Sequence, residues 1–255
     1  MRYIIMSGTS DATKVIKYLS NDENYIIATT VTDYGAEIAK NAGATEVISK
    51  ALKQEDFVKV IKENNIDTLI DATHPFASVA TETAIKSAQE AEINYIRYER
   101  ASTVLPETDL IHEVESFEKA AQLADQMLED EDKLMHLAGV MTLGEITKVV
   151  NPEKVIARVL PNTFSITKTQ KSGVPAENII AMQGTFSKEF NKSLINEYNV
   201  SIVLTKESGE SGGAEEKINA ALELNIPVIL VTRPVVKDLD KYPVVRSIDE
   251  LDKII

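Results

Sequence analysis

Two stretches of the chain decide its fold: residues 65–100, NIDTLIDATHPFASVATETAIKSAQEAEINYIRYER, and residues 199–234, NVSIVLTKESGESGGAEEKINAALELNIPVILVTRP. Each begins with an asparagine and a short apolar run. Each continues through a polar loop and an alanine-rich helical pattern to a second apolar run and an arginine. Short apolar runs that alternate with helical patterns predict βαβ units and a parallel sheet. Because the pattern occurs twice, it predicts two related domains.

The rest of the chain extends this repeat. Residues 133–150 repeat the strand, glycine turn and helix of residues 2–19, and each half ends in a strand–serine–helix piece, at 112–124 and 243–255. We therefore predict an α/β fold of two Rossmann-like domains with mostly parallel sheets, residues 1–130 and 131–255. The acidic stretch at 129–133 fits a solvated joint between them. If the carboxyl edges of the two sheets face each other, the ligand lies in a cleft between the domains.

Bulk composition excludes several classes of protein. The chain has 27 Lys+Arg against 40 Asp+Glu, a net charge of −13, which opposes binding to nucleic acid and to anionic membranes. No apolar run is long enough to span a membrane, and the first residues form a strand pattern rather than a signal peptide. There is no cysteine and no metal-binding histidine spacing, so we expect no metal site and a cytoplasmic location.

The loop DATHPFA, residues 71–77, follows an apolar strand pattern and precedes a helical one. Pro75 suits the first position of that helix, with Thr73 or His74 as its cap. A plain capped helix with a buried Asp71 would explain part of this pattern. However, one cap is enough for a helix, and ligands bind outside the carboxyl ends of parallel strands. The acid, hydroxyl and imidazole together therefore predict a binding site.

The loop MSGTSDA, residues 6–12, occupies the turn after the first predicted strand. Gly8 permits a tight turn, and Thr9 or Ser10 can cap the next helix, whose first N–H groups attract phosphate. A plain capped turn is the alternative, because the GxGxxG pattern is absent. At the end of the second strand, Thr30 and Thr32 occupy the region where NAD enzymes often place an acid for the ribose. This does not decide between NADH and NADPH.

The second half has two polar loops at predicted strand ends. One is QGTFSKE at 183–189, where Gly184 begins a turn into a helix, and the other is TKESGESGG at 205–213, whose glycines and Lys206 suit an anion. Basic residues recur at or near the predicted carboxyl edges and form a candidate anion-binding patch: Arg97, Arg100, Arg158, Lys206, Lys217 and Arg233. The other two histidines, His112 and His136, fall within strands and are expected to be packed or at the surface.

Taken together, SGTSDA, DATHPFA, YIRYER, QGTF and the Lys-x-Ser-Gly segment with its Arg-Pro resemble the precorrin-6A reductase family along nearly the whole chain. The resemblance implies two Rossmann-like domains and an enzyme that reduces one double bond of precorrin-6A, or of its cobalt form, in corrin-ring synthesis. NADPH or NADH would supply the hydride, and a proton would be added at the neighbouring carbon.

The resemblance also implies roles for individual residues. The cofactor phosphates would meet Gly8, Thr9 and Ser10, and the adenosine ribose would lie near Thr30 and Thr32. The nicotinamide end would be lined by Thr73, His74 and Pro75, with His74 as proton donor or positioning group. From the second domain, Gly184 and Lys206 would reach the cofactor, and the substrate would meet Lys206, Ser208 and Gly209, with Arg100 and Arg233 on its carboxylates. Ser7 and Thr185 depart from the family's glycine and proline.

Two other functions fit parts of the pattern. A Rossmann-type reductase or epimerase of another small substrate often carries Tyr-x-x-x-Lys, and the stretches after Tyr18, Tyr95 and Tyr198 lack that lysine. A non-catalytic dinucleotide sensor would bind NAD(P)H without oxidising it. Solvent or a substrate propionate could replace His74 as proton donor. The presence of cobalt in the substrate and the choice between a monomer and a small homo-oligomer stay open.

Overall fold

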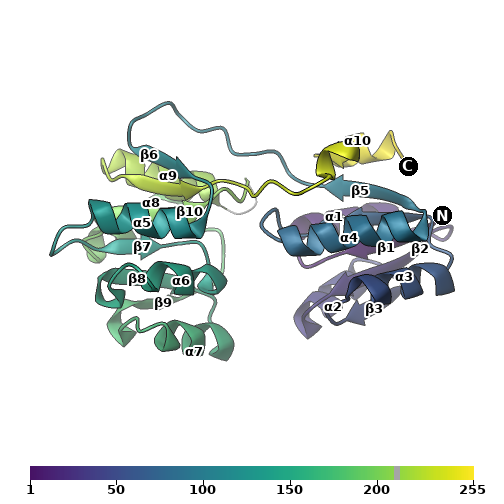
Figure 1. The fold of residues 1–255 in the computed structure, drawn as a ribbon, viewed down its shortest axis with the longest axis horizontal. Helices are drawn as coiled ribbons and strands as arrows, with labels where there is room; N and C mark the ends of the chain where they lie inside the picture. The colour runs from purple at the N-terminus through teal and green to yellow at the C-terminus, as the bar shows by residue number, and fades with distance from the viewer. Residues whose placement is uncertain (210–212) are drawn as a thin grey trace. The chain divides into compact units, whose positions relative to one another are not determined.

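The computed structural model describes residues 1–209 and 213–255 and divides into two compact units. Unit 1 comprises residues 1–101 and 234–255, and unit 2 comprises residues 102–233. Figure 1 shows that each unit is a sheet with helices packed against it. All the strand pairs are parallel in the described parts of the chain, which confirms the predicted α/β fold.

Unit 1 has a six-stranded sheet in the order β12-β5-β4-β1-β2-β3. Successive strand residues face opposite sides, so Ile5 packs in one apolar cluster with α1 while Ile4 packs in another with α3 and α4. The strands are β1 (Arg2–Met6), β2 (Tyr25–Thr30), β3 (Glu46–Ser49), β4 (Thr68–Asp71), β5 (Asn94–Tyr98) and β12 (Val244–Val245). The helices are α1 (Ser10–Leu19), α2 (Asp33–Asn41), α3 (Gln54–Glu63), α4 (Ser78–Ala91), the short η4 (Leu239–Lys241) and α10 (Ile248–Asp252).

Unit 2 repeats this plan with the strand order β6-β11-β10-β7-β8-β9. Its strands are β6 (Ile111–Val114), β7 (Leu134–His136), β8 (Val155–Val159), β9 (Ile179–Ala181), β10 (Ile202–Lys206) and β11 (Val228–Val231). Its helices are α5 (Phe117–Met127), α6 (Val140–Thr147), η1 (Pro152–Lys154), α7 (Thr163–Lys171), η2 (Ala176–Asn178), α8 (Lys188–Glu197) and α9 (Ala214–Glu223). In each sheet the central strand, β1 or β7, leads through a turn with a positive-φ glycine, Gly8 or Gly139, into a helix.

The predicted boundary between residues 130 and 131 is wrong, because the two strand–serine–helix pieces are exchanged. Strand β6 pairs with β11 in unit 2, although it follows unit 1 in the sequence. Strand β12, near the C-terminus, pairs with β5 in unit 1. The acidic stretch at 129–133 therefore lies inside unit 2, and the chain passes between units after residues 101 and 233.

Local sequence cannot reveal this exchange because the two pieces are built alike. Ser116 caps α5 by accepting a hydrogen bond from the Lys119 N–H, and Ser247 caps α10 from the Glu250 N–H in the same way. Either piece could extend either sheet by a parallel strand. No helix in the described residues has both the length and the apolar character that a membrane span requires.

Candidate active site

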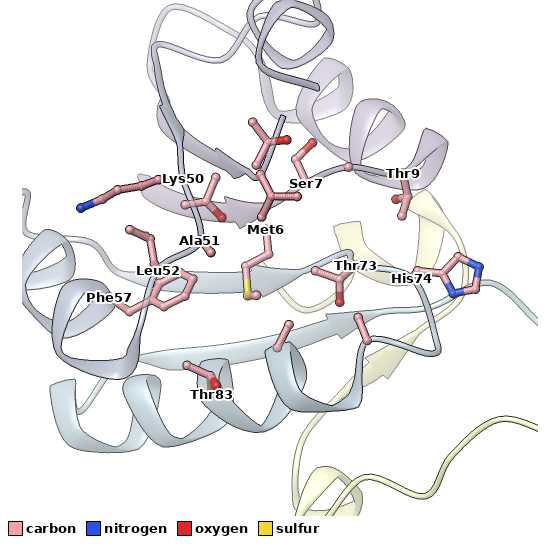
Figure 2. A pocket seen from close by; sticks show the side chains of 16 residues that line it. Met6, Ser7, Thr9, Lys50, Ala51, Leu52, Phe57, Thr73, His74 and Thr83 are labelled. Atoms are coloured by element: carbon pink, nitrogen blue, oxygen red, sulfur yellow. The ribbon is translucent and has the colours of Figure 1, made fainter. Parts of the chain in front are cut away.

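A cavity of about 300 Å³ lies at the carboxyl edge of the unit 1 sheet. It is lined by the loops after β1, β2, β3 and β4, and Figure 2 shows the labelled side chains that surround it. Among the residues predicted from the sequence, the structure brings five together in its lining: Gly8, Thr9, Thr30, Thr73 and His74. The side chains of Ser10, Thr32 and Pro75 are not part of the lining.

The turn after β1 is shaped for close approach of a ligand. Gly8 has φ +108°, a conformation that L side chains rarely adopt, and a Cβ placed there would meet open space. Thr9 is the N-cap of α1: its Oγ1 accepts from the Ala12 N–H at 3.0 Å and donates to the Ala72 carbonyl at 2.7 Å. The second bond ties this turn to the loop after β4. Ser10 is the first helical residue rather than the cap, and its side chain is exposed.

At the end of β2, the two predicted threonines have different environments. Thr30 is buried and lines the cavity, whereas Thr32 is exposed and caps α2 by accepting from the Gly35 N–H at 3.0 Å. A Cβ on Gly35 would lie 2.3 Å from the Thr30 Oγ1, so a glycine is needed for α2 to approach Thr30. Lys50 and Leu52, which were not predicted from the sequence, line the same cavity after β3. Their position at the carboxyl end of a parallel strand was the signal that could have identified them.

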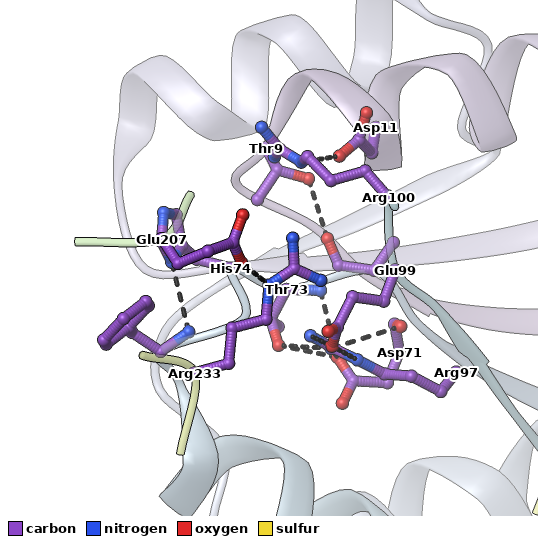
Figure 3. Close-up of polar contacts among 12 residues, drawn as sticks. Thr9, Asp11, Asp71, Thr73, His74, Arg97, Glu99, Arg100, Glu207 and Arg233 are labelled. Atoms are coloured by element: carbon purple, nitrogen blue, oxygen red, sulfur yellow. Dashed lines mark hydrogen bonds and ion pairs between the residues drawn. The ribbon is translucent and has the colours of Figure 1, made fainter. Parts of the chain in front are cut away.

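Asp71 explains why the loop after β4 carries an acid. It is the last residue of β4 and is fully buried. Its Oδ1 accepts from the Thr73 N–H at 3.0 Å and from the Thr73 hydroxyl at 2.7 Å, and lies 2.8 Å from the Arg97 Nη1 (Figure 3). Its Oδ2 accepts from the Tyr95 hydroxyl at 3.1 Å. Burial, and then the Asp71 charge, raise the pKa of Tyr95, so this phenol stays a hydrogen-bond donor.

Arg97 is the counter-ion of this carboxylate and is itself only 1% exposed. Its Nη1 also donates to the Thr73 Oγ1 at 3.0 Å, and its Nε donates to the Glu99 Oε2 at 2.9 Å. Burial alone would lower the pKa of Arg97, but Asp71 and Glu99 raise it above its usual value, so the guanidinium stays charged. The structure therefore places this member of the predicted basic patch inside the protein, where it holds the loop that carries Thr73.

The predicted place of Pro75 at the first position of the next helix is wrong. Helix α4 begins at Ser78, and its N-cap residue Ala77 makes no side-chain capping bond. Pro75 lies before the helix in a turn that the Ala77 N–H closes onto the His74 carbonyl at 2.8 Å. The Phe76 N–H donates to the His74 Nδ1 at 3.2 Å. Because a backbone N–H only donates, this hydrogen bond requires the His74 Nδ1 to accept.

Two further predicted cations of the patch form ion pairs within their own units. The Arg100 Nε lies 2.6 Å from the Asp11 Oδ2 in the first turn of α1 (Figure 3). The Arg233 Nε donates to the buried Glu207. Glu207 was missed by the sequence analysis, and its Oε1 accepts from the Thr103 and Gly209 N–H groups, each at 3.0 Å. Ser208 and Gly209 beside it are buried, and residues 210–212 of the same predicted loop lie outside the described residues.

Unit 2 has a cavity of about 340 Å³ at the corresponding carboxyl edge. Gly139, Arg158, Gly184 and Lys206 line it. Gly184 and Lys206 are thus placed together in unit 2, and their predicted contact with the cofactor stays a prediction. Within the described residues, no group of three or more His, Asp and Glu side chains converges on a metal-binding geometry.

Three cations of the predicted patch lie close together around this second cavity. Arg158 donates from Nη1 to the Asn191 Oδ1 at 2.8 Å, and its guanidinium lies 5.2 Å from the centre of the Phe186 ring. Burial lowers the pKa of Lys206 and lowers that of Arg158 to about 10. Burial, together with the charges of Arg158 and Lys206, lowers the pKa of Lys217 to about 7. An anion that entered here would relieve the repulsion among these three cations.

His136 behaves as a packed strand residue. It is fully buried in β7, and its Nε2 lies 3.1 Å from the Thr142 Oγ1. Burial, and then the charge of Lys206, lower the pKa of His136 to about 3, so the ring is neutral at physiological pH.

Comparison with known families decides what kind of protein carries these two pockets. Residues 2–255 match the model of the precorrin-6x reductase CbiJ/CobK family. The chain belongs to this family. The match covers both Rossmann-like units, so it confirms the resemblance found in the sequence.

Curated relatives agree with this assignment. The cobalt-precorrin-6A reductase of Methanothermobacter thermautotrophicus is 44% identical over 98% of this chain and 82% of its own length. The cobalt-precorrin-6A reductase of Methanocaldococcus jannaschii is 41% identical over 100% of this chain and 97% of its own length. The solved structure of CobK precorrin-6A reductase has the same fold, with a TM-score of 0.75 over 99% of this chain and 95% of its own, at 18% identity.

Proposed function

We propose that this chain is an NAD(P)H-dependent oxidoreductase that reduces a macrocycle double bond of cobalt-precorrin-6A, or of its metal-free form, in cobalamin biosynthesis. One observation carries the proposal. The Gly8 turn and the loop that carries Thr73 and His74 line one cavity in unit 1. The chain that carries this cavity belongs to the precorrin-6x reductase family and matches cobalt-precorrin-6A reductases over 98–100% of its length.

The unit 1 pocket fits a nicotinamide dinucleotide. Its sheet has the strand order of a dinucleotide-binding Rossmann fold, in which the ligand crosses the point where the order reverses, between β1 and β4. The open space at Gly8 and the start of the Thr9-capped α1 suit the pyrophosphate. The adenosine half would then lie towards Thr30 and Lys50, and the nicotinamide half towards Thr73 and His74.

The unit 2 pocket fits the carboxylates of the macrocycle. A protein of net charge −13 must neutralise an anionic substrate locally, and Lys206 and Arg158 line this cavity with Lys217 close to both. The Arg100 and Arg233 guanidinium groups already pair with Asp11 and Glu207. Because Lys206 and Arg158 line the unit 2 cavity, we assign the first contacts with substrate carboxylates to them, and a supporting part to Arg100, Ser208, Gly209 and Arg233.

When bound, NAD(P)H supplies the hydride, so the residues of this chain must position the reactants and exclude water. His74 suits positioning better than proton donation. A neutral imidazole is too weak an acid to give up its Nε2 proton, and the imidazolium would place a second proton on Nδ1, against the Phe76 N–H. A propionate of the substrate or a solvent molecule would then supply the proton. A cytoplasmic location, a monomer or small homo-oligomer, and a ligand cleft between the domains stay predictions.

The test is to mix the purified protein with cobalt-precorrin-6A under anaerobic conditions and to follow NADH and NADPH absorbance in separate reactions. We expect one or both to be oxidised, with a mass gain of two hydrogens on the macrocycle. Binding of both nucleotides without oxidation would contradict the proposal and favour the dinucleotide sensor. Oxidation with metal-free precorrin-6A alone would leave the reductase in place but change its substrate.

A further inference from the structure

The hydroxyl proton of Thr73 is used in a hydrogen bond within the protein. It donates to the Asp71 Oδ1 at 2.7 Å and accepts from the Arg97 Nη1 at 3.0 Å. A threonine hydroxyl has one proton and two lone pairs. The buried pair therefore uses the only proton and one of the lone pairs, and leaves one lone pair for a ligand.

The orientation of this hydroxyl is strongly held. Asp71 and Arg97 are 0% and 1% exposed, and both lie on neighbouring strands of the sheet, β4 and β5. The Thr73 N–H is bound to the same Asp71 oxygen at 3.0 Å, so the backbone is held as well as the side chain. A flip that offered the proton to a ligand would leave the Asp71 carboxylate with one donor fewer in a site that water does not reach, which is costly. Towards the cavity, Thr73 therefore acts only as an acceptor.

The position of Thr73 selects the part of the ligand that it meets. It lines the unit 1 cavity at the carboxyl end of β4, across the reversal point from the β2 and β3 ends that receive the adenosine half (Figure 2). Ala77 and Ala80 line the cavity on the α4 side and offer an apolar surface for an aromatic ring. On a nicotinamide, the group beside the ring that carries a hydrogen-bond donor is the carboxamide NH₂.

We propose that Thr73, held by Asp71 and Arg97, accepts a hydrogen bond from the carboxamide NH₂ of the nicotinamide and so fixes the rotation of the ring. This inference rests on the proposed function and adds a residue that selects the carboxamide. Asp71 and Arg97 are its positioning residues. The expected ligand preference is specific: an analogue that keeps the ring and the carbonyl but lacks the NH₂ should bind more weakly.

The test compares NAD⁺ and NADP⁺ with their 3-acetylpyridine analogues, in which a methyl group replaces the NH₂, by calorimetric titration of the wild-type protein. A lost hydrogen bond predicts that the analogue binds about tenfold more weakly. Thr73→Val should bind both ligands with nearly equal affinity, close to that of the analogue on the wild type. Thr73→Ser keeps the hydroxyl and should keep the preference, which guards against a valine variant that fails to fold.

Thr83→Val is the matched control, because Thr83 lines the same cavity but donates its hydroxyl to the Val79 carbonyl of its own helix at 2.7 Å. It should leave the ratio of the two affinities unchanged. Equal binding of both ligands to the wild type, or an unchanged ratio in Thr73→Val, would overturn this inference and leave the reductase intact. If neither natural dinucleotide binds, the proposed function itself fails.

Discussion

Replacing Arg97 with methionine tests whether the Asp71–Arg97 pair holds the candidate active site together. Methionine approximates the length of the arginine stem but removes the guanidinium that lies 2.8 Å from the Asp71 Oδ1 and donates to Thr73 and Glu99. Asp71 is fully buried, so its carboxylate would lose its counter-ion in a place that water does not reach.

The expected cost follows from the burial of both partners. Removing one member of a buried ion pair typically costs about 3–5 kcal/mol, because the other charge is left uncompensated. At about 1.4 kcal/mol per factor of ten, this lowers the ratio of folded to unfolded unit 1 by roughly two to three and a half powers of ten. In the double variant Asp71→Asn/Arg97→Met no charge is stranded at position 71, so we expect it to be more stable than Arg97→Met alone.

The measurement is hydrogen exchange by mass spectrometry in increasing urea, since the chain has no tryptophan to report unfolding. Peptides from β4 and β5 report unit 1, and peptides from β10 and β11 serve as an internal reference in unit 2. A cost below about 1 kcal/mol, the range of exposed ion pairs, would refute the reasoning. So would a double variant whose cost equals the sum of the two single costs.

Three other predictions test the turn, the second pocket and the exchanged strands. Gly8→Ala should cost about 1–2 kcal/mol of backbone strain and weaken dinucleotide binding. Gly144→Ala, inside α6, should cause no strain and leave binding unchanged. Thermal unfolding measures the change in stability, and calorimetric titration measures the change in binding. Lys217 has its pKa lowered to about 7 by burial and by neighbouring cations, so the unfolded state binds more protons than the folded state above that pH. Stability should therefore rise with pH from about 7 towards 10, and Lys217→Met should reduce that rise in urea unfolding curves, leaving the smaller contribution of Lys206. Leu251→Ala should cost about 2–5 kcal/mol and speed hydrogen exchange in unit 1 rather than unit 2, because Leu251 is buried in the unit 1 core. Faster hydrogen exchange in unit 2 instead would contradict the assignment of the C-terminal strand and helix to unit 1.

The lining of the unit 1 pocket was largely accessible from the sequence. Gly8, Thr9, Thr30, Thr73 and His74 each lie at or just after the end of an apolar strand pattern, and parallel strands place such positions at one edge of the sheet. Capping was predicted less well. Thr9 rather than Ser10 caps α1, and α4 begins at Ser78 because Pro75 and Phe76 form a separate turn. Several hydroxyl and proline choices satisfy the same local rules, so the choice depends on contacts such as the bond from Thr9 to Ala72.

The basic patch shows what the sequence leaves undecided. Arg97, Arg100 and Arg233 were placed in a candidate anion-binding patch, and the structure pairs them with Asp71, Asp11 and Glu207, while the contact of Arg100 and Arg233 with a substrate stays a prediction. A cation at the end of a strand can meet a ligand or a carboxylate from another strand. Only the three-dimensional arrangement distinguishes these outcomes, because the carboxylate partner can come from a distant part of the chain.

By itself, the sequence determined the alternation of strands and helices, the duplication, the family and the loops that form the unit 1 pocket. These features depend on residue periodicity and on motifs within a few positions of one another. The tertiary structure alone decided which sheet receives β6 and which receives β12, and which cations are ion-paired. The physical reason is that the backbone groups of an edge strand and the charge of a buried arginine are satisfied by partners far along the chain. Nothing in the neighbouring residues records which partner that is.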